Sequence, residues 1–345
     1  MNILVLAGGY SPERDVSLTS GSLIANALKR EGEKVCLADV YLGIDESELS
    51  RADLFNSVEG EVYKITNSVP DLKALKEKSG NGDALIGRGI IELCRRADVV
   101  FLALHGAMGE NGQLQATLDN YGIKYTGSGY VGSLLAMDKD ISKKMFVGAG
   151  VNTPEWIYVS VKDFNKGEFE EKIGYPCVVK PCSCGSSVGI SIVENECELD
   201  AALRIAEEYE EHVLIEKKIV GRELTVGIID GEVLPAIEII PTEGFYDYTN
   251  KYQAGKTLEI CPAEIGEKLK NTVCEQTKLA FESLRLSGYA RFDYMVDESG
   301  KLWCLEANTL PGMTPTSLLP QMAAADGMSY GKLCLKIVEL AQNKK

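Results

Sequence analysis

Four polar side chains in the last quarter of the chain have the types and spacing needed to bind a metal ion beside a phosphate. They occur in the stretch RFDYMVDESGKLWCLEANTLPGMTPTS, residues 291–317. Runs of β-branched and aromatic residues on both sides of the turn-forming residues 297–300 predict a β-hairpin, with Val296 opposite Lys301. Because side chains alternate across a strand, one face of this hairpin would carry Arg291, Asp293, Glu306 and Asn308.

Oxygen donors of this kind suit Mg²⁺, which proteins usually share with nucleotide phosphates. An alternative is that Arg291 and Glu306, which face each other in this register, form a cross-strand ion pair on a hydrated sheet face. That alternative gives no reason for Asp293 and Asn308 to lie beside the pair. The sequence therefore favours a magnesium–phosphate site.

The composition is that of an ordinary globular protein with an acidic balance. A length of 345 residues predicts two or three domains, and 45% apolar and 25% charged residues are typical values. The formal charge of −15, with no block of Lys and Arg to offset it, argues against a nucleic-acid partner. The sequence contains no apolar run of about 18 residues, so it predicts no membrane span. The N-terminal stretch MNILVLAGG lacks the basic flank of a signal peptide. We therefore expect a cytoplasmic protein with neither a nucleic acid nor a membrane as partner.

The cysteines and histidines exclude several kinds of site. The ten cysteines are scattered, so without a secretory signal we expect reduced thiols. Cys182 and Cys184 form a C-x-C pair that lacks the second ligand pair of a zinc site, and we expect them to be bystanders. With His105 and His212 as the two histidines, zinc proteases and Ser-His-Asp hydrolases have little support.

The first part of the chain alternates apolar strands with helical patterns, which predicts a doubly wound α/β domain. Strands are expected at 2–7, 34–41 and 98–104, and a helix at 17–30. The turn after the first strand is not G-x-G-x-x-G, so a nicotinamide site has weak support. Open sheets of this kind bind ligands beyond the carboxyl ends of their strands, where Glu13 and His105 lie. The residues leave open whether His105 contacts a ligand or only the backbone of its turn.

The middle of the chain contains a glycine- and serine-rich loop between two strand patterns. A strand at 175–181 includes Lys180 and is followed by CSCGSSVGI, whose backbone N–H groups and hydroxyls suit phosphate oxygens. The loop is not G-x-x-x-x-G-K-[ST], which excludes a P-loop. Such a loop can also be an ordinary turn, but the lysine before it and the acidic pair downstream favour phosphate contact.

The remaining patterns predict scaffold elements and one unusual segment. Residues 241–257 combine three tyrosines, two glycines and two lysines and break the apolar pattern, which is typical of a functional lid. We expect helices at 196–211, 263–286 and 329–342, and strands at 212–217 and 222–226.

Six ordered motifs resemble those of the D-alanine–D-alanine ligases of the ATP-grasp superfamily. They are GGYSPERDVSLTSG, HGAMGENGQLQ, DKDISKK, VVKPCSCGSSVGI, FYDYTNKY, and ARFDYMV followed by LEANTLPGMTPTSL. The resemblance covers essentially the whole chain. It implies an α/β N-terminal doubly wound domain at 1–127, followed by two α+β lobes of an ATP-grasp fold at 128–215 and 216–345. It also implies ATP-dependent formation of D-Ala-D-Ala for peptidoglycan precursors, through a D-alanyl phosphate intermediate, by a protein that is commonly a homodimer.

The resemblance implies a role for each matching residue. Those expected to contact ATP are Lys139, Lys180, Ser187, Glu216, Lys217, Ile219, Glu223, Tyr246 and Lys251. Those expected to hold two Mg²⁺ or Mn²⁺ ions are Asp293, Glu306 and Asn308. Glu13 and His105 would anchor the first D-alanine, and Ser317 the carboxylate of the second. Arg291 and the Gly312 amide would stabilise the oxyanion, while Tyr252, Ser186 and Glu13 would form a relay around the second substrate.

Two departures and three alternatives accompany this interpretation. Cys182 and Cys184 are uncharged where many relatives carry charge, and the region 40–95 is longer than in compact members.

A different ATP-grasp ligase would have no reason to combine Glu13, Tyr252 and Ser317. A ligase that accepts D-serine or D-lactate would differ near the second-substrate site. A non-catalytic nucleotide-binding or thiol-sensing protein would have no need of the complete set of metal ligands.

Overall fold

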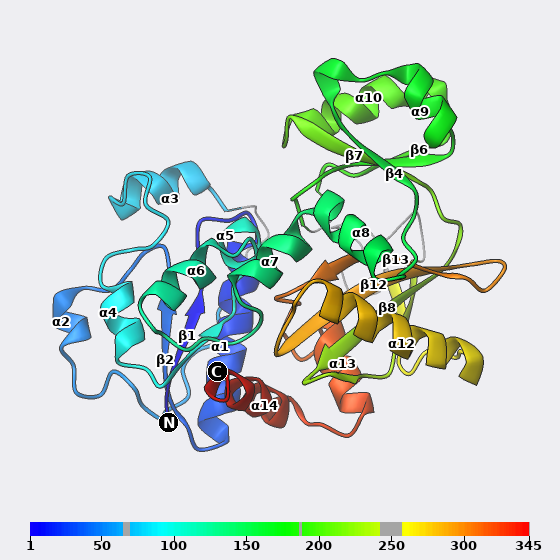
Figure 1. Ribbon diagram of the computed structural model, residues 1–345. Coiled ribbons are helices and arrows are strands. Elements are labelled where there is room, and N and C mark those ends of the chain that lie inside the picture. The colour runs from blue at the N-terminus through cyan, green and yellow to red at the C-terminus, as the bar shows by residue number, and fades with distance from the viewer. Residues whose placement is uncertain (65–69, 186–187, 242–256, 345) are drawn as a thin grey trace.

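The structure is a computed structural model that describes residues 1–64, 70–185, 188–241 and 257–344. The strands of these residues form three sheets, one in each of three units that Figure 1 shows around a common centre. No helix among them is long and apolar enough to cross a membrane.

The N-terminal sheet is parallel, in the order β2–β1–β3, with strands β1 Asn2–Ala7, β2 Lys34–Asp39 and β3 Val99–Leu102. Residues 3–7 of β1 are fully buried, because a parallel strand covered on both faces must be apolar throughout. The helices of this unit are α1 Arg14–Arg30, α2 Glu46–Leu49, α3 Leu72–Ser79, α4 Ile90–Arg95, α5 Ala107–Glu110 and α6 Gln113–Asn120. The predicted doubly wound pattern of strands and helices is present here.

Helices α7 Tyr130–Met137 and α8 Lys139–Gly148 lead to the central unit. Its antiparallel sheet has the order β4–β7–β5–β6, with β4 Trp156–Ser160, β5 Cys177–Pro181, β6 Ser191–Val193 and β7 His212–Lys217. The short 3₁₀ helix Val161–Asp163 and helices α9 Lys166–Lys172 and α10 Glu196–Glu207 complete the unit. Helix α10 ends four residues before the predicted end at 211, where Glu211 already leads into β7.

The third sheet has the order β11–β10–β8–β12–β13, with β9 paired to β8. Its strands are β8 Gly221–Ile229, β9 Glu232–Val233, β10 Ile237–Pro241, β11 Thr257–Ile260, β12 Tyr289–Asp297 and β13 Leu302–Asn308. Helix α12 Glu267–Ser283 lies between β11 and β12 in the chain, and helices α13 Leu318–Ala325 and α14 Tyr330–Gln342 follow β13. Helix α12 is shorter than the predicted 263–286, and α13 was not predicted.

The predicted hairpin is present, but its predicted register is wrong. Val296 pairs with Leu302 rather than Lys301, and the Asp297 N–H donates to the Lys301 carbonyl, so the turn comprises residues 298–300, where Gly300 adopts a φ of +81°. A second shift between Asp293 and Tyr294 then places Asp293 opposite Glu306. Without this irregularity Glu306 would pair with Phe292, whose side chain belongs to the other face. The bulge therefore brings the two carboxylates together.

The N-terminal and C-terminal units share one apolar core. Helix α14 packs on α1 and β3, and its Leu333, Ile337 and Val338 belong to the same buried cluster as the side chains of β1. Figure 1 shows α14 beneath the N-terminal unit, with the two marked ends of the chain near each other. The chain thus returns to its first sheet before it ends.

Candidate active site

A cavity of about 340 Å³ lies between the central and third sheets. Its apolar walls include Val178, Ile190, Ile192, Val220, Met295 and Leu305. Seven of the residues singled out from the sequence also line it: Lys180, Glu216, Lys217, Ile219, Glu223, Asp293 and Glu306. An apolar slot with charged groups at its edge suits a flat heterocycle that carries a polar chain.

A buried cluster of two lysines and one carboxylate lies at the edge of this cavity. Lys180 Nζ is 2.5 Å from Glu216 Oε1, and Lys143 Nζ is 2.7 Å from Glu216 Oε2. Burial opposes ionisation of Glu216, but the charges of the two lysines outweigh it and lower its pKa to about 2. For Lys143, burial opposes the charged form and lowers the pKa of its ammonium group to about 8, although the charge of Glu216 opposes this change. The sequence had indicated Lys180 and Glu216 but not their mutual ion pair.

Lys143 was missed, although a signal was present. It lies four residues after Lys139 in DKDISKK, and positions four apart share one face of a helix. The Lys143 side chain is fully buried, and its ammonium also donates to Thr153 Oγ1 at 2.7 Å. This lysine therefore joins α8 to β7 beneath the cavity.

Lys139 connects the glycine-rich loop to the hairpin. Its ammonium donates to the carbonyl of Cys184 at 2.7 Å and lies 3.5 Å from Glu306 Oε2. Asp138 caps α8 by accepting from the Ile141 N–H at 2.9 Å, which fixes where the helix begins. A cation is thus held between the loop and a carboxylate of the hairpin.

The structure brings the four predicted residues of the hairpin together. Arg291 donates from Nε and Nη2 to the two carboxylate oxygens of Asp293, both at 2.9 Å. Asn308 Nδ2 and Thr225 Oγ1 donate to the same carboxylate, at 3.0 and 2.7 Å. Glu306 lies opposite Asp293 across the ladder.

The donor set of this face fits a hard divalent cation. No group of three or more His, Cys, Asp or Glu side chains among the described residues is placed to hold a metal. Two facing carboxylates with the amide oxygen of Asn308 nevertheless supply three hard oxygen donors, and nucleotide phosphates usually complete the coordination of Mg²⁺. Asp293 already accepts several hydrogen bonds, which hold its carboxylate in position.

A second group of charged residues lies at the carboxyl end of the N-terminal sheet. Glu13 precedes α1, and His105 follows β3. The pKa of His105 is lowered by burial, which the charge of Glu13 opposes and that of Arg291 reinforces. Within the described residues, the buried Nε2 of His105 has no hydrogen-bond partner. Because the charges of Glu13 and Arg291 both affect the pKa of His105, the end of the first sheet faces the hairpin of the third.

Glu110 is a half-buried carboxyl of this group that the sequence interpretation did not single out. It accepts a hydrogen bond from the Gly106 N–H at 2.7 Å. Burial, and then the charge of Glu13, raise the pKa of Glu110 to about 8. The raised pKa favours the protonated form of Glu110 near neutral pH, so the group carries less negative charge than its sequence suggests.

Gly312 and Ser317 lie side by side at the start of α13. A Cβ on Gly312 would be 2.9 Å from Ser317 Oγ, so a side chain there would displace the Ser317 hydroxyl. Ser317 precedes the first residue of α13, and its hydroxyl shares a 2.8 Å hydrogen bond with that of Thr314.

Several predicted residues lie outside the described ones: Ser186, Ser187, Tyr246, Lys251 and Tyr252. The predicted lid at 241–257 likewise falls mostly outside them, and its described ends, Pro241 and Thr257, are register partners of β10 and β11. All ten cysteines are free, as expected. Cys182 is buried, which raises the pKa of its thiol to about 12.

Comparison with known proteins covers nearly the whole chain. Residues 2–128 match the family description "D-ala D-ala ligase N-terminus", and residues 145–339 match "D-ala D-ala ligase C-terminus". The D-alanine–D-alanine ligase of Pediococcus pentosaceus is 41% identical over 342 residues, which are 98% of this chain and 97% of the relative. That of Syntrophotalea carbinolica is 39% identical over 343 residues, or 99% and 97% of the two chains.

Solved structures of the same family superpose along the full length. The crystal structure of the D-alanine–D-alanine ligase from Bacillus anthracis gives a TM-score of 0.77 at 34% identity and covers 99% of this chain and 97% of that one. The D-Ala:D-Ser ligase VanG of Enterococcus faecalis gives 0.74 at 28% identity, with 99% of both chains covered. These likenesses confirm the ATP-grasp fold inferred from the motifs. With both family regions matched and relatives similar from end to end, the chain belongs to the D-alanine–D-alanine ligase family.

Proposed function

We propose that this protein joins two D-alanine molecules at the expense of ATP and releases D-Ala-D-Ala, ADP and phosphate. The observation that carries the proposal is the cavity between the central and third sheets, which seven of the residues singled out from the sequence line. The charges of Glu13 and Arg291 both act on His105, which brings the end of the first sheet and the third sheet to the same region. Family membership supplies the reaction, and a Bacillus anthracis relative was solved in complex with ATP.

The positive charges around the cavity suit the first step. In that step the carboxylate of the first D-alanine attacks the γ-phosphorus of ATP, ADP leaves, and an acyl phosphate forms. Lys139 and Lys180 would bind the phosphates and offset charge on the transferred oxygens. The base and ribose would lie against Glu216 and Lys217, which lie on β7, and against Ile219 and Glu223.

Asp293, Glu306 and Asn308 would hold Mg²⁺ or Mn²⁺, with two ions as the proposed number. A bound divalent cation would neutralise phosphate charge and orient the phosphates. Lys139 lies 3.5 Å from Glu306, so this lysine would keep the phosphates and the metal ligands in register.

The second step needs a site for developing negative charge. The amine of the second D-alanine attacks the acyl carbon, the tetrahedral oxyanion collapses, and phosphate leaves. Arg291 and the Gly312 N–H would stabilise that oxyanion, and removal of one such donor typically costs about 3–4 kcal/mol of barrier. Glu13 and His105 would anchor the first substrate, and Ser317 the carboxylate of the second.

The residues outside the described part complete the proposal from the family resemblance alone. Ser187, Tyr246 and Lys251 would contact ATP, and Ser186 with Tyr252 would relay hydrogen bonds to Glu13. We also propose that segment 241–257 is the lid, that the domains are 1–127, 128–215 and 216–345, and that the protein is a cytoplasmic homodimer serving peptidoglycan synthesis.

The second candidate is a ligase that accepts D-serine or D-lactate in place of the second D-alanine. The likeness to a D-Ala:D-Ser ligase at 28% identity supports it, but relatives that carry the D-alanine–D-alanine name reach 41%. We therefore favour D-alanine as the acceptor.

A substrate panel tests the proposal. Purified protein is incubated with ATP, Mg²⁺ and D-alanine, alone or with D-serine or D-lactate, and phosphate release and product mass are measured. L-alanine is the control. We expect phosphate release that depends on D-alanine and a D-Ala-D-Ala product. A mixed product in preference to D-Ala-D-Ala would establish the second candidate, and no release with any D-amino acid would refute both.

A further inference from the structure

Glu210 lies against the glycine-rich loop that follows β5, whose described residues 182–185 and 188–189 we call the phosphate loop because their pattern suits phosphate oxygens. It is half-buried and stands between α10 and β7. Its Oε2 accepts the Cys182 N–H at 3.0 Å, and its Oε1 accepts the Ser183 N–H at 2.9 Å. The Cys184 thiol also donates to Oε1 at 3.5 Å. One carboxylate thus binds three consecutive residues of the loop.

The opposite side of these residues is held by the start of α8. The Lys139 N–H donates to the Cys182 carbonyl at 3.1 Å, and the Lys139 ammonium donates to the Cys184 carbonyl at 2.7 Å. The peptide group between Cys182 and Ser183 is therefore bound at both ends, by Glu210 at its N–H and by Lys139 at its carbonyl. A peptide held in this way cannot flip without breaking both hydrogen bonds.

The neighbouring Tyr209 supports the other stem of the loop. A Cβ on Gly189 would lie 2.8 Å from Cδ2 of the Tyr209 ring and 2.7 Å from Cγ of Pro181. The ring therefore packs against the loop where the chain leaves it, while Glu210 binds it where the chain enters. Two consecutive residues hold both stems.

The placement of a carboxylate here is electrostatically unexpected. A negative charge beside a site for a polyanion weakens binding unless the carboxylate does something that offsets the repulsion. Its oxygens accept the N–H groups of Cys182 and Ser183, which fixes the orientation of these two peptide groups. The two loop carbonyls at Cys182 and Cys184 face Lys139 instead, whose ammonium reaches Glu306. The carboxylate and Lys139 together fix the conformation of the loop backbone at 182–184.

We propose that Glu210 is a positioning residue that orients the phosphate loop, through its backbone N–H groups, for binding of the ATP triphosphate. This inference rests on the proposed function, because ATP binding is proposed there. It predicts that the loss of Glu210 weakens ATP binding, even though a negative charge is removed from the neighbourhood of a polyanion.

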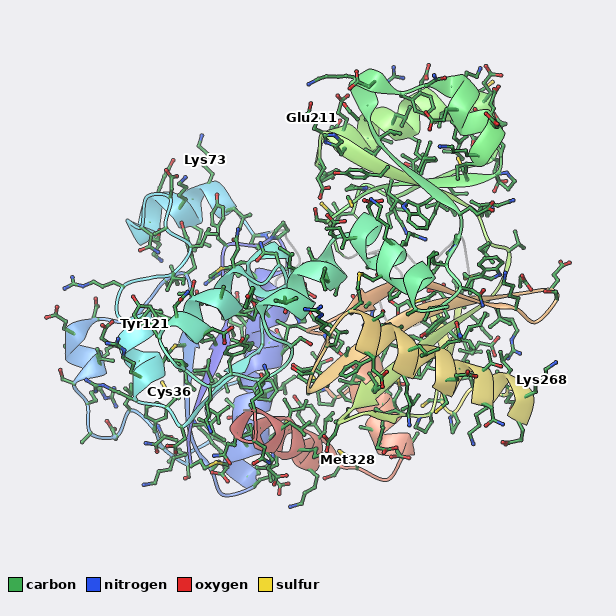
Figure 2. All side chains as sticks on the ribbon, viewed as in Figure 1. Cys36, Lys73, Tyr121, Glu211, Lys268 and Met328 are labelled. Carbon is green, nitrogen blue, oxygen red and sulfur yellow. The ribbon has the colours of Figure 1, made fainter. Side chains whose placement is uncertain are left out.

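Alanine substitutions at two adjacent glutamates test this inference. Glu210→Ala removes the hydrogen bonds to the loop. Glu211→Ala removes the same charge from the next residue, whose side chain is mostly exposed and pairs with Lys162 at 3.3 Å instead of the loop. Figure 2 shows Glu211 at the edge of the central unit. Binding of ATP with Mg²⁺ is measured by calorimetry without D-alanine, and the KM values of ATP and D-alanine and kcat are measured separately.

For Glu210→Ala we expect the Kd and KM of ATP to rise about tenfold, as for the loss of charge-assisted hydrogen bonds, with the KM of D-alanine within about twofold of wild type. Glu210→Gln keeps one acceptor oxygen, so its Kd and KM of ATP should rise less, by about threefold. Glu211→Ala should match wild type. If the alanine variant does not fold, the glutamine variant decides.

Two results would overturn the inference. A fall in the Kd of ATP for both Glu210→Ala and Glu211→Ala would show that Glu210 acts only as a repelling charge. An unchanged Kd with a lowered Tm would show that it merely stabilises the fold. Failure of the proposed function looks different: wild type would then bind ATP but form no D-alanine product, and the comparison of Kd values would still decide the role of Glu210.

Discussion

At the scale of single residues, Glu216 sets the net charge at the edge of the cavity. Two ammonium groups, on Lys143 and Lys180, flank this one buried carboxylate, so the cluster has a net charge of +1 at neutral pH. Breaking a buried pair by removing one partner typically costs about 3–5 kcal/mol, because the remaining charge is left uncompensated. The cluster therefore stabilises the interface of α8 with β7 and also leaves positive charge for an anionic ligand.

Glu110→Gln should change how stability depends on pH. The folded-state pKa of Glu110 is about 8, above its ordinary value of 4.5, so the folded protein binds more protons than the unfolded chain between these values. Its stabilising contribution is present below pH 4.5 and is lost as the pH rises towards 8. Glutamine resembles the protonated carboxyl and has no such loss.

We therefore expect the stability of Glu110→Gln relative to wild type to rise between pH 5 and pH 8, on the order of 1 kcal/mol per pH unit. Denaturant unfolding at pH 5, 6, 7 and 8 measures it. Glu92→Gln, which changes an exposed residue of α4, is the control. A stability difference that stays constant with pH would contradict the raised pKa.

Glu306→Gln should abolish turnover far more than it affects folding. Glu306 faces Asp293 and the Lys139 ammonium rather than an apolar core, so its carboxylate is placed for a cation. We expect kcat to fall at least about 100-fold, with Tm within a few degrees of wild type. Glu298→Gln, in the exposed hairpin loop, is the matched control. Wild-type turnover with an unchanged Mg²⁺ requirement would exclude Glu306 as a metal ligand.

At the scale of elements, the hairpin of β12 and β13 shows what the sequence could and could not predict. Its strands and its polar face followed from alternation, which is a local property. Its register did not, because it depends on the left-handed conformation of Gly300 and on a bulge beside Asp293. The two register shifts move Glu306 from opposite Arg291, as predicted, to opposite Asp293.

Other misses have similar physical reasons. Helix α13 contains Pro320 in its first turn, where a missing N–H costs nothing, but a proline in a short apolar run does not suggest a helix. The contacts of Lys143 with Glu216 and of Glu210 with the phosphate loop join residues that are far apart in the chain or in different elements. Residue types and spacing predicted the charged groups of the site, whereas their partners required the fold.

Gly300→Ala should destabilise the hairpin. The backbone φ of +81° is one that L-residues adopt at a cost, and no atom lies within 4 Å of the added Cβ, so strain alone sets the effect. We expect a loss of about 1 kcal/mol in the free energy of unfolding. Gly148→Ala, at the end of α8 with equally open space, should be neutral or stabilising. Urea denaturation compares them, and equal effects of the two substitutions would contradict the argument.

At the scale of the whole molecule, the third sheet is joined to the first by α13 and α14. Leu333, Ile337 and Val338 of α14 fill the same core as the side chains of β1, although nearly the whole chain separates the two elements. The sheet that His105 follows and the hairpin that carries Arg291 are thereby connected through apolar packing. The geometry of the site therefore depends on a core that lies well away from it.

Ile337→Ala should loosen the N-terminal sheet. The side chain is 1% exposed, and its truncation should cost about 2–5 kcal/mol through lost burial and a cavity. Hydrogen exchange of a peptide that covers β1 should become faster, although the substitution lies in α14. Ile205→Ala, on α10 with 45% exposure, is the control. Unchanged exchange of β1 in Ile337→Ala would show that α14 does not support this sheet.

The return of α14 to the first sheet also bears on how the protein is made. Synthesis proceeds from β1 towards α14, so the first sheet leaves the ribosome without the helix that covers part of its core. Until α14 emerges, apolar side chains of α1 and β3 stay uncovered. We therefore expect chaperones to bind the nascent N-terminal unit. A chain stalled before α14 should therefore be prone to aggregate, whereas the central unit, whose core is closed within residues 157–215, can fold as soon as it has been translated.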